Sequence, residues 1–246
     1  MPSSHSSDAQ SWDVIQQLPV QDYKTLRRAG RMIECRGGTK ICNQGELDAP
    51  VYFLRTGIVK VSRTALPGSP EMIVDVSGAG DILGAEACLR NKQSHVSLTA
   101  TKDVTALEVP RVAFLQFLER HPKAALLLMA AIAERGRVRD ATLAFAAHKV
   151  HDRLLAFLYR QAQRHGTEDD SHAVTIDIGF RLVDVAAAIG GSVASVSTEL
   201  ERFKADGLIE TGYKSMKVPK QVFRDHRKLL KAEPYFIDDV GEGQQR

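Results

Sequence analysis

The chain is poor in cysteine, and it lacks long apolar runs. Three cysteines among 246 residues, Cys35, Cys42 and Cys88, are too few and too scattered for a disulfide framework or for the four thiolates of an iron–sulfur cluster. No apolar run approaches the roughly 20 residues of a membrane-spanning helix, and residues 1–10 lack the apolar core of a signal peptide. We therefore expect a cytoplasmic protein with free, mostly buried thiols. A redox-responsive Cys35/Cys42 pair is the alternative, because their spacing allows them to lie on adjacent strands.

A strong net charge and a catalytic constellation are missing as well. The net charge is only +3, and no Ser/His/Asp or metal-ligand arrangement stands out, so we expect neither an enzyme nor a metal site. Positive charge is nevertheless concentrated near the C-terminus, because residues 192–231 hold nine Lys and Arg against five acids. This excess is typical of a surface that faces phosphates, although a solvated basic face has the same composition.

Residues 31–109 alternate short β-like runs with glycine-containing turns. This texture predicts an all-β sandwich or barrel, preceded by one or two short helices in residues 12–29. The segment Gly78–Leu89 interrupts it, and its three glycines suit either an ordinary turn or a turn whose N–H groups hold an anion. The expected strands are Arg31–Cys35, Thr39–Cys42, Val51–Leu54, Ile58–Arg63, Glu71–Val76, Val96–Thr101 and Val104–Val109.

The longest expected helix runs from Pro122 to about Ala147. At 1.5 Å per residue it would be roughly 38 Å long, which is long for a small domain. Such a helix most often buries its apolar stripe against a twin helix in a dimer, and packing along its own β-domain is the alternative. Arg135, Arg137 and Arg139 cluster mid-helix, either solvated or facing a ligand. The residues assigned to the dimer stripe are Leu128, Ile132, Val138, Thr142 and Phe145.

Two short amphipathic helices follow in Phe180–Ile209, separated by a Gly-Gly-Ser break. Glycine readily ends the first helix, and Ser192 can cap the second by accepting a hydrogen bond from a free backbone N–H. This order predicts a helix-turn-helix, whose second helix enters a DNA major groove, or else an ordinary helical hairpin. Two strands expected after residue 209 add a wing, and a basic helix is expected over Val222–Lys231. The residues assigned to DNA are Ser192, Val193, Ser195, Ser197, Thr198, Arg202, Lys214 and Lys217.

With these elements in this order, the chain resembles the bacterial regulator family of the cyclic-AMP receptor protein and the fumarate-nitrate reduction regulator. The supporting motifs are Val51–Leu54 with Gly57–Val61, then Gly80–Gly84, and finally Phe180–Ile209, within a match over residues 20–231. The resemblance implies an α+β fold: an N-terminal jelly roll of the cyclic-nucleotide-binding type, a long dimerisation helix and a C-terminal winged helix-turn-helix. It also implies a transcription regulator that binds double-stranded DNA as a homodimer on a palindromic promoter site, commonly through contact with RNA polymerase, with no membrane involved.

The resemblance also sets the expected domain boundaries. They are a flexible N-terminus at 1–19, a sensor domain at 20–121, a dimerisation helix at 122–148, a DNA-binding domain at 149–231 and a flexible tail at 232–246.

The effector pocket departs from the family pattern. In cyclic-AMP-responsive members a Glu follows the Gly-Asp-x-x-Gly turn, and a later Arg-Ser pair binds the cyclic phosphate. Here Ala85 follows Gly84, Glu86 is displaced by one, and Ser94 and His95 stand at the Arg-Ser positions. Without that arginine the pocket lacks the bidentate, charge-assisted partner of a phosphate. The effector is therefore expected to be absent or not cyclic AMP, and the assigned pocket residues are Gly84, Ala85, Glu86, Ser94, His95 and Arg139.

Other cofactors and the base readout depart from the family too. The iron–sulfur cluster of fumarate-nitrate-type members is disfavoured, because residues 1–34 contain no cysteine, whereas a haem is left open by His95 and Cys88. The reading helix holds Val193, Ala194 and Thr198 where the family commonly has Arg or Val, then Glu, and a later Arg. Val and Ala suit thymine methyls, so the sequence predicts an altered and weaker readout. The second hypothesis is a small-molecule-binding module whose DNA-binding head has weak specificity and acts mainly through protein contacts.

Overall fold

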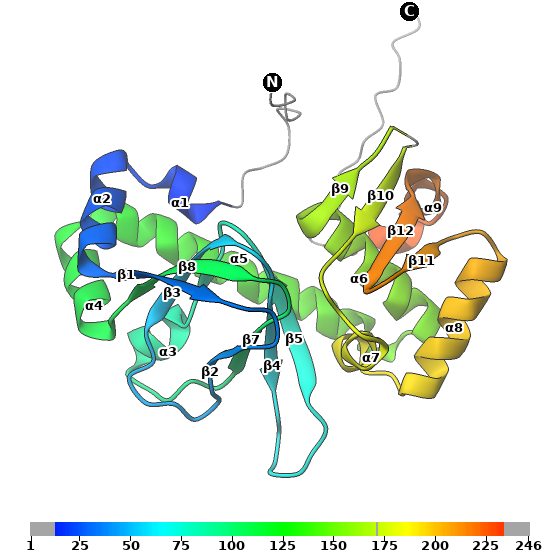
Figure 1. Ribbon diagram of the computed structural model, residues 1–246, viewed down its shortest axis with the longest axis horizontal. Helices are drawn as coiled ribbons and strands as arrows, with labels where there is room; N and C mark the ends of the chain where they lie inside the picture. The colour runs from blue at the N-terminus through cyan, green and yellow to red at the C-terminus, as the bar shows by residue number, and fades with distance from the viewer. Residues whose placement is uncertain (1–12, 171, 234–246) are drawn as a thin grey trace, which may run out of the picture. The chain divides into compact units, whose positions relative to one another are not determined.

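The chain divides into two compact units, Met1–Gly136 and Arg137–Arg246, and the computed structural model describes residues 13–170 and 172–233 (Figure 1). The parts of the expected flexible segments at 1–12 and 234–246 lie outside the described residues. Within the described part, each helix is too short or too polar to cross a membrane.

The first unit contains two four-stranded antiparallel sheets. One sheet has the order β1 (Arg31–Cys35), β8 (Val104–Val109), β3 (Val51–Thr56) and β6 (Ile82–Leu83). The other has the order β2 (Lys40–Cys42), β7 (Ser97–Ala100), β4 (Val59–Arg63) and β5 (Met72–Ser77). The predicted β-domain is confirmed, with strand ends shifted by at most two residues. Strand β6 is not predicted from the sequence, because only two residues of the glycine-rich Gly78–Leu89 segment pair with β3.

Alternation along β3 explains how the unit forms two hydrophobic layers. Successive side chains of a strand point to opposite faces. Tyr52 and Leu54 therefore join the core between the two sheets, whereas Val51 and Phe53 join a second core under the helices. All four are at most 3% exposed, so β3 is buried on both faces.

Four short helices accompany the sheets: α1 (Val14–Gln17), α2 (Val20–Ala29), α3 (Ala85–Arg90) and α4 (Arg111–Arg120). Asp13 caps α1 by accepting from the backbone N–H groups of Ile15 and Gln16. Val14, Ile15 and Leu18 are buried in the core under the helices. The expected flexible segment 1–19 is thus wrong for residues 13–19, because their apolar side chains pack against the β-domain.

The dimer stripe predicted on the long helix α5 (Pro122–Ala144) faces the chain itself and not a partner. Leu128 is 1% exposed and lies with Ile132 in the core of its own unit, while Val138 and Phe145 are also buried within the chain. Thr142 accepts a hydrogen bond from Arg160 at 2.6 Å. The alternative of packing along the β-domain therefore holds for Leu128 and Ile132, whereas Val138, Thr142 and Phe145 belong to the second unit. An apolar stripe predicts burial but not the partner. The helix ends at Ala144, and a 3₁₀ turn, η1 (Phe145–Ala147), follows.

In the second unit, α6 (Val150–His165) carries Arg160, which binds the last described residue of the chain. Arg160 makes two 2.9 Å hydrogen bonds to the carboxylate of Glu233, which is 3% exposed. The expected flexible tail from residue 232 is therefore wrong for Glu233, which is fixed by this buried ion pair.

The remaining elements of this unit form the predicted winged helix-turn-helix. A sheet of order β11-β12-β10-β9 is joined by the helices α7 and α8. The predicted basic helix Val222–Lys231 is corrected to two short helices that meet at His226. The bounds are β9 (Gly166–Glu168), β10 (Ala173–Ile176), α7 (Leu182–Ile189), α8 (Val193–Ala205), β11 (Glu210–Gly212), β12 (Ser215–Pro219), α9 (Lys220–Asp225) and α10 (Arg227–Leu230).

Candidate DNA-binding surface and effector pocket

The turn between α7 and α8 is hydrogen-bonded to α6. Gly190 adopts φ +64°, a left-handed conformation that costs glycine little and ends α7. Arg153 of α6 donates to the carbonyl oxygens of Ile189 and Gly190 at 2.7 and 2.9 Å. These bonds satisfy carbonyls that the end of a helix leaves free, so the turn is fixed relative to α6.

Two serines cap the start of α8 and bond to each other. Ser192 is the cap, and its hydroxyl oxygen accepts from the backbone N–H of Ser195 at 3.0 Å. The two hydroxyls also bond to each other at 2.9 Å, and the Ser195 hydroxyl donates to the Ser192 carbonyl oxygen at 2.9 Å. The predicted cap is confirmed, and its consequence is that both serines, which we assigned to DNA, are engaged within the helix.

The body of α8 presents one exposed face. Val196 and Phe203 are fully buried beneath it, and His151 of α6 holds Glu199 at 2.7 Å. Ser197 is half-buried, whereas Val193, Thr198 and Arg202 are exposed. Arg202 lies 3.8 Å from Asp206, in a surface pair that contributes little.

The wing is the hairpin of β11 and β12. Gly212 pairs with Ser215, so Tyr213 and Lys214 form a two-residue turn, in which Lys214 has φ +55°. Tyr213 is 88% exposed, and the Lys214 ammonium lies 5.3 Å from its ring centroid. The predicted Lys214 is therefore at the exposed tip of the wing.

Lys217 lies in a different environment from the one that its assignment to DNA requires. Its ammonium is 2.7 Å from the Asp169 carboxylate, and this hydrogen bond raises the pKa of Lys217. Glu210 is its register partner on β11 and adds a second negative charge. Lys220 is likewise paired with Glu168 at 2.6 Å. The sequence does not reveal Glu168 and Asp169 as partners, because they belong to β9 and the loop after it, and β9 is too short and polar to be predicted.

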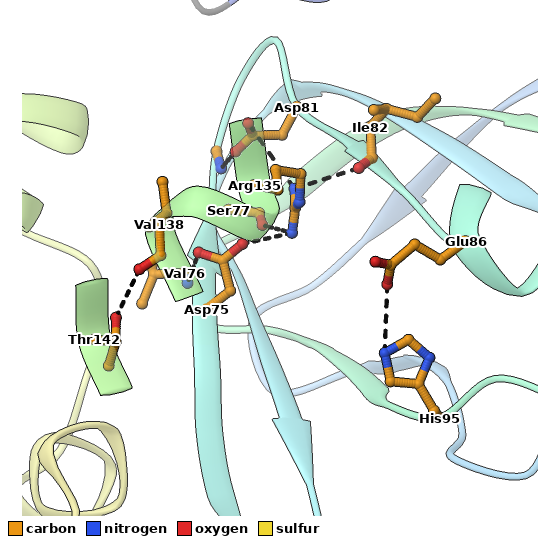
Figure 2. A network of polar contacts seen from close by, with 11 residues as sticks. Asp75, Val76, Ser77, Asp81, Ile82, Glu86, His95, Arg135, Val138 and Thr142 are labelled. Carbon is orange, nitrogen blue, oxygen red and sulfur yellow. Dashed lines mark hydrogen bonds and ion pairs between the residues drawn. The ribbon is translucent and has the colours of Figure 1, made fainter. Parts of the chain in front are cut away.

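The pocket segment brings only some of the assigned residues together. Gly84 has φ +80°, and a side chain there would meet the Pro50 carbonyl oxygen, so it makes a tight turn before α3. The side chains of Glu86 and His95 point towards each other in Figure 2, with 3.4 Å between the carboxylate and the ring nitrogen. Ser94 is 4% exposed and donates its hydroxyl to the Val96 carbonyl oxygen at 2.7 Å. Ala85 is buried at the start of α3, and Arg139 belongs to the second unit.

Arg135 binds the segment that precedes Gly84, a contact that the sequence does not predict. Its guanidinium donates to Asp75 at 2.6 Å, to Ser77 at 3.0 Å and to the Ile82 carbonyl oxygen at 3.3 Å, and Figure 2 draws these bonds as dashed lines. A second carboxylate, Asp81, lies 4.0 Å away and accepts from the Gly78 N–H at 2.8 Å. Both the arginine and a glycine N–H of the predicted anion turn thus bind carboxylates of the chain itself. The signal in the sequence was an Asp and a Ser at alternate positions of the otherwise apolar strand β5.

The cysteines are free, as predicted, and Cys42 and Cys88 are buried. Burial raises the pKa of the Cys42 thiol to about 11, and it raises the pKa values of Cys35 and Cys88 as well. Cys35 on β1 and Cys42 on β2 belong to different sheets, so the idea that they occupy adjacent strands is wrong.

Comparisons with known families match each unit separately. Residues 32–121 match the cyclic nucleotide-binding domain, and residues 152–221 match the Crp-like helix-turn-helix domain. The chain is 26% identical to the cyclic AMP receptor protein of Thermus thermophilus over 175 residues, which are 71% of this chain and 77% of that protein.

Other relatives share less of the chain or only its fold. The mouse patatin-like phospholipase domain-containing protein 6 is 23% identical over 147 residues, but this chain spans only 11% of its length. The structure of CLP from Xanthomonas campestris, a global regulator described as c-di-GMP responsive, superimposes with a TM-score of 0.71 at 14% identity, covering 82% of this chain and 99% of that one. With its β-domain, long helix and Crp-like helix-turn-helix, the chain belongs to the family of transcription regulators of the cyclic-AMP receptor protein and the fumarate-nitrate reduction regulator.

Proposed function

We propose that this protein acts as a homodimer on a palindromic site in double-stranded DNA, and that it regulates transcription from there through RNA polymerase. The observation that carries the proposal is α8, which is bonded to α6 and exposes its N-terminal turns, in a unit whose exposed wing turn carries Lys214. A recognition helix of this geometry contacts bases with its first residues, while lysines and free backbone N–H groups contact phosphates.

The homodimer is supported by a second face of α5, on the outside of the chain. Leu126 and Leu143 are 65% and 68% exposed, and Met129 is 48% exposed. With the exposed Ala133 and Asp140 between them, these residues follow steps of three, four, seven and three, which is the spacing of a coiled-coil seam. A twin helix would remove this apolar surface from water.

For the effector, we propose that cyclic AMP is not bound in the manner of the family. The hydroxyl of Ser94 and the guanidinium of Arg135 both have partners within the chain. A cyclic phosphate would have to compete with the Asp75 carboxylate for the arginine. Separating the buried carboxylate from the guanidinium would cost free energy.

Selection from a pool of random DNA tests the proposed function. The purified protein is mixed with the pool at low salt, with and without cell extract as a source of effector. We expect an enriched palindrome whose affinity falls steeply as salt rises, because bound lysines release counterions from the phosphates. A pool that stays random under both conditions would favour the second hypothesis, a module that acts mainly through protein contacts.

A further inference from the structure

The exposed turns of α8 have lost most of their side-chain hydrogen-bond donors to internal bonds. A serine or threonine hydroxyl carries one proton, so it can donate only once. Ser192 donates to the Ser195 hydroxyl, Ser195 to the Ser192 carbonyl oxygen, and Thr198 to the Ala194 carbonyl oxygen at 3.1 Å. The oxygens of these hydroxyls still have lone pairs, and towards a base they act as acceptors.

Apolar groups occupy the first two positions of the same helix. Val193 is 45% exposed, and Ala194 is exposed beside it. The first cation along α8 is Arg202, which shares a face with Thr198 but is nine residues beyond Val193, or about 14 Å further along the helix axis at 1.5 Å per residue. The end of α8 that reaches furthest towards a groove thus offers methyl groups and oxygen acceptors.

This surface complements one kind of base pair. In the major groove both pairs present an amino donor, on adenine or on cytosine, but a G·C pair adds two guanine acceptors that need a donor such as arginine, whereas an A·T pair adds the thymine methyl. We infer that α8 reads A·T pairs, with Val193 and Ala194 against thymine methyls and the Thr198 hydroxyl oxygen accepting from an adenine amino group. The inference rests on the proposed function, since it names the base pairs that the same surface prefers.

Deoxyuridine tests the methyl contacts directly, because it differs from thymidine only by lacking the methyl group. The site enriched from random DNA is synthesised with each thymine replaced in turn. We expect affinity to fall about fourfold at each contacted thymine, because each replacement removes one methyl group that binding buries. Replacements at thymines outside the two half-sites should leave affinity unchanged.

Variants assign the contact to its residue. In Val193→Ala the ratio of thymidine to deoxyuridine affinity should fall towards one at a single position of each half-site. Val183→Ala is the matched control, because Val183 is 47% exposed on α7 and lies outside α8, so the ratio should persist. Val193→Arg, which restores a donor, should shift the selected base at that position towards guanine.

The outcomes separate the inference from the function on which it rests. A protein that binds no DNA would overturn both. A protein that binds its palindrome with G·C pairs opposite α8, or with no response to deoxyuridine, would overturn the A·T readout and leave the proposed function intact.

Discussion

At the scale of single residues, charge in the DNA-binding unit is decided by partners that lie far away in the sequence. Lys217 was an obvious candidate for a phosphate contact, yet Asp169 holds its ammonium at 2.7 Å and Glu210 lies opposite it on β11. The sequence shows only that basic residues are numerous near the C-terminus. Which of them face acids depends on the pairing of β9, β10 and β12, and β9 is too short and polar to be predicted.

We expect Asp169→Asn to strengthen DNA binding, because it releases Lys217. One additional phosphate contact should make the slope of log affinity against log salt steeper by about 0.9. Fluorescence anisotropy with the selected site over a salt series measures both quantities. Asp170→Asn is the matched control, since it removes the same charge one residue away. Lys217→Ala should cancel the gain in the Asp169→Asn background, and an equal gain from both asparagine variants would show that general charge is responsible.

Thiol reactivity should follow burial, because the thiolate is the reactive form. At pH 8 a thiol reagent should label half-buried Cys35 first, while Cys42 and Cys88 should react only after unfolding. Burial raises the pKa of Cys42 from about 9 to about 11. The neutral buried thiol therefore stabilises the fold fully below pH 9, and this contribution is lost as the pH rises to about 11. Urea unfolding at pH 8 and 10.5 should show a smaller pH effect in Cys42→Ala, and an unchanged effect would contradict this account.

At the scale of elements, the sequence predicts the strands well and the faces of the long helix poorly. Strands such as β3 and β8 follow from apolar residues between glycine-containing turns, because each turn limits the length of the strand. In α5 the apolar residues are distributed over two faces. Leu128 and Val138 face their own chain, whereas Leu126, Met129 and Leu143 face outwards. Both faces have helical spacing, so only the packing distinguishes them.

A charged residue on the outer face of α5 should separate the dimer. We expect Leu126→Glu and Leu143→Glu to yield a folded monomer, because the two carboxylates would lie opposite each other in a seam between twin helices. Sedimentation equilibrium measures the mass, and circular dichroism checks the fold. Leu66→Glu is the matched control, since Leu66 is also 68% exposed but lies in the loop before β5, and it should remain dimeric.

A change on the inner face of α5 should act differently. Leu128→Ala removes a side chain that is 1% exposed, and it should cost about 2–5 kcal/mol of stability through the cavity that it leaves. A dimer that persists in both outer-face variants but is lost in Leu128→Ala would place the interface on the inner face of α5, along the stripe that contains Leu128.

At the scale of the whole molecule, the chain combines the family scaffold with polar side chains that are bonded to one another. The order of β-domain, long helix and winged helix-turn-helix could be predicted, since each follows from periodicity and turns. The Arg135 network could not, because Asp75 and Arg135 are 60 residues apart and meet only when α5 packs on β5. In the pocket and on α8 alike, polar groups that would meet a ligand are bonded within the chain.

The pocket therefore leads to a prediction about the intact protein: cyclic AMP should leave its melting temperature unchanged. A ligand that binds only the folded state at 100 times its Kd stabilises it by about 2.7 kcal/mol, which corresponds to several degrees for a chain of this size. Differential scanning fluorimetry with millimolar nucleotide measures the shift, and the selected DNA site serves as a positive control that should raise the melting temperature. DNA affinity should be equally insensitive to the nucleotide. A rise at micromolar cyclic AMP that disappears in Ser94→Ala would mean that the Ser94 hydroxyl exchanges its bond to Val96 for the cyclic phosphate, and that the pocket works in the family manner without its arginine.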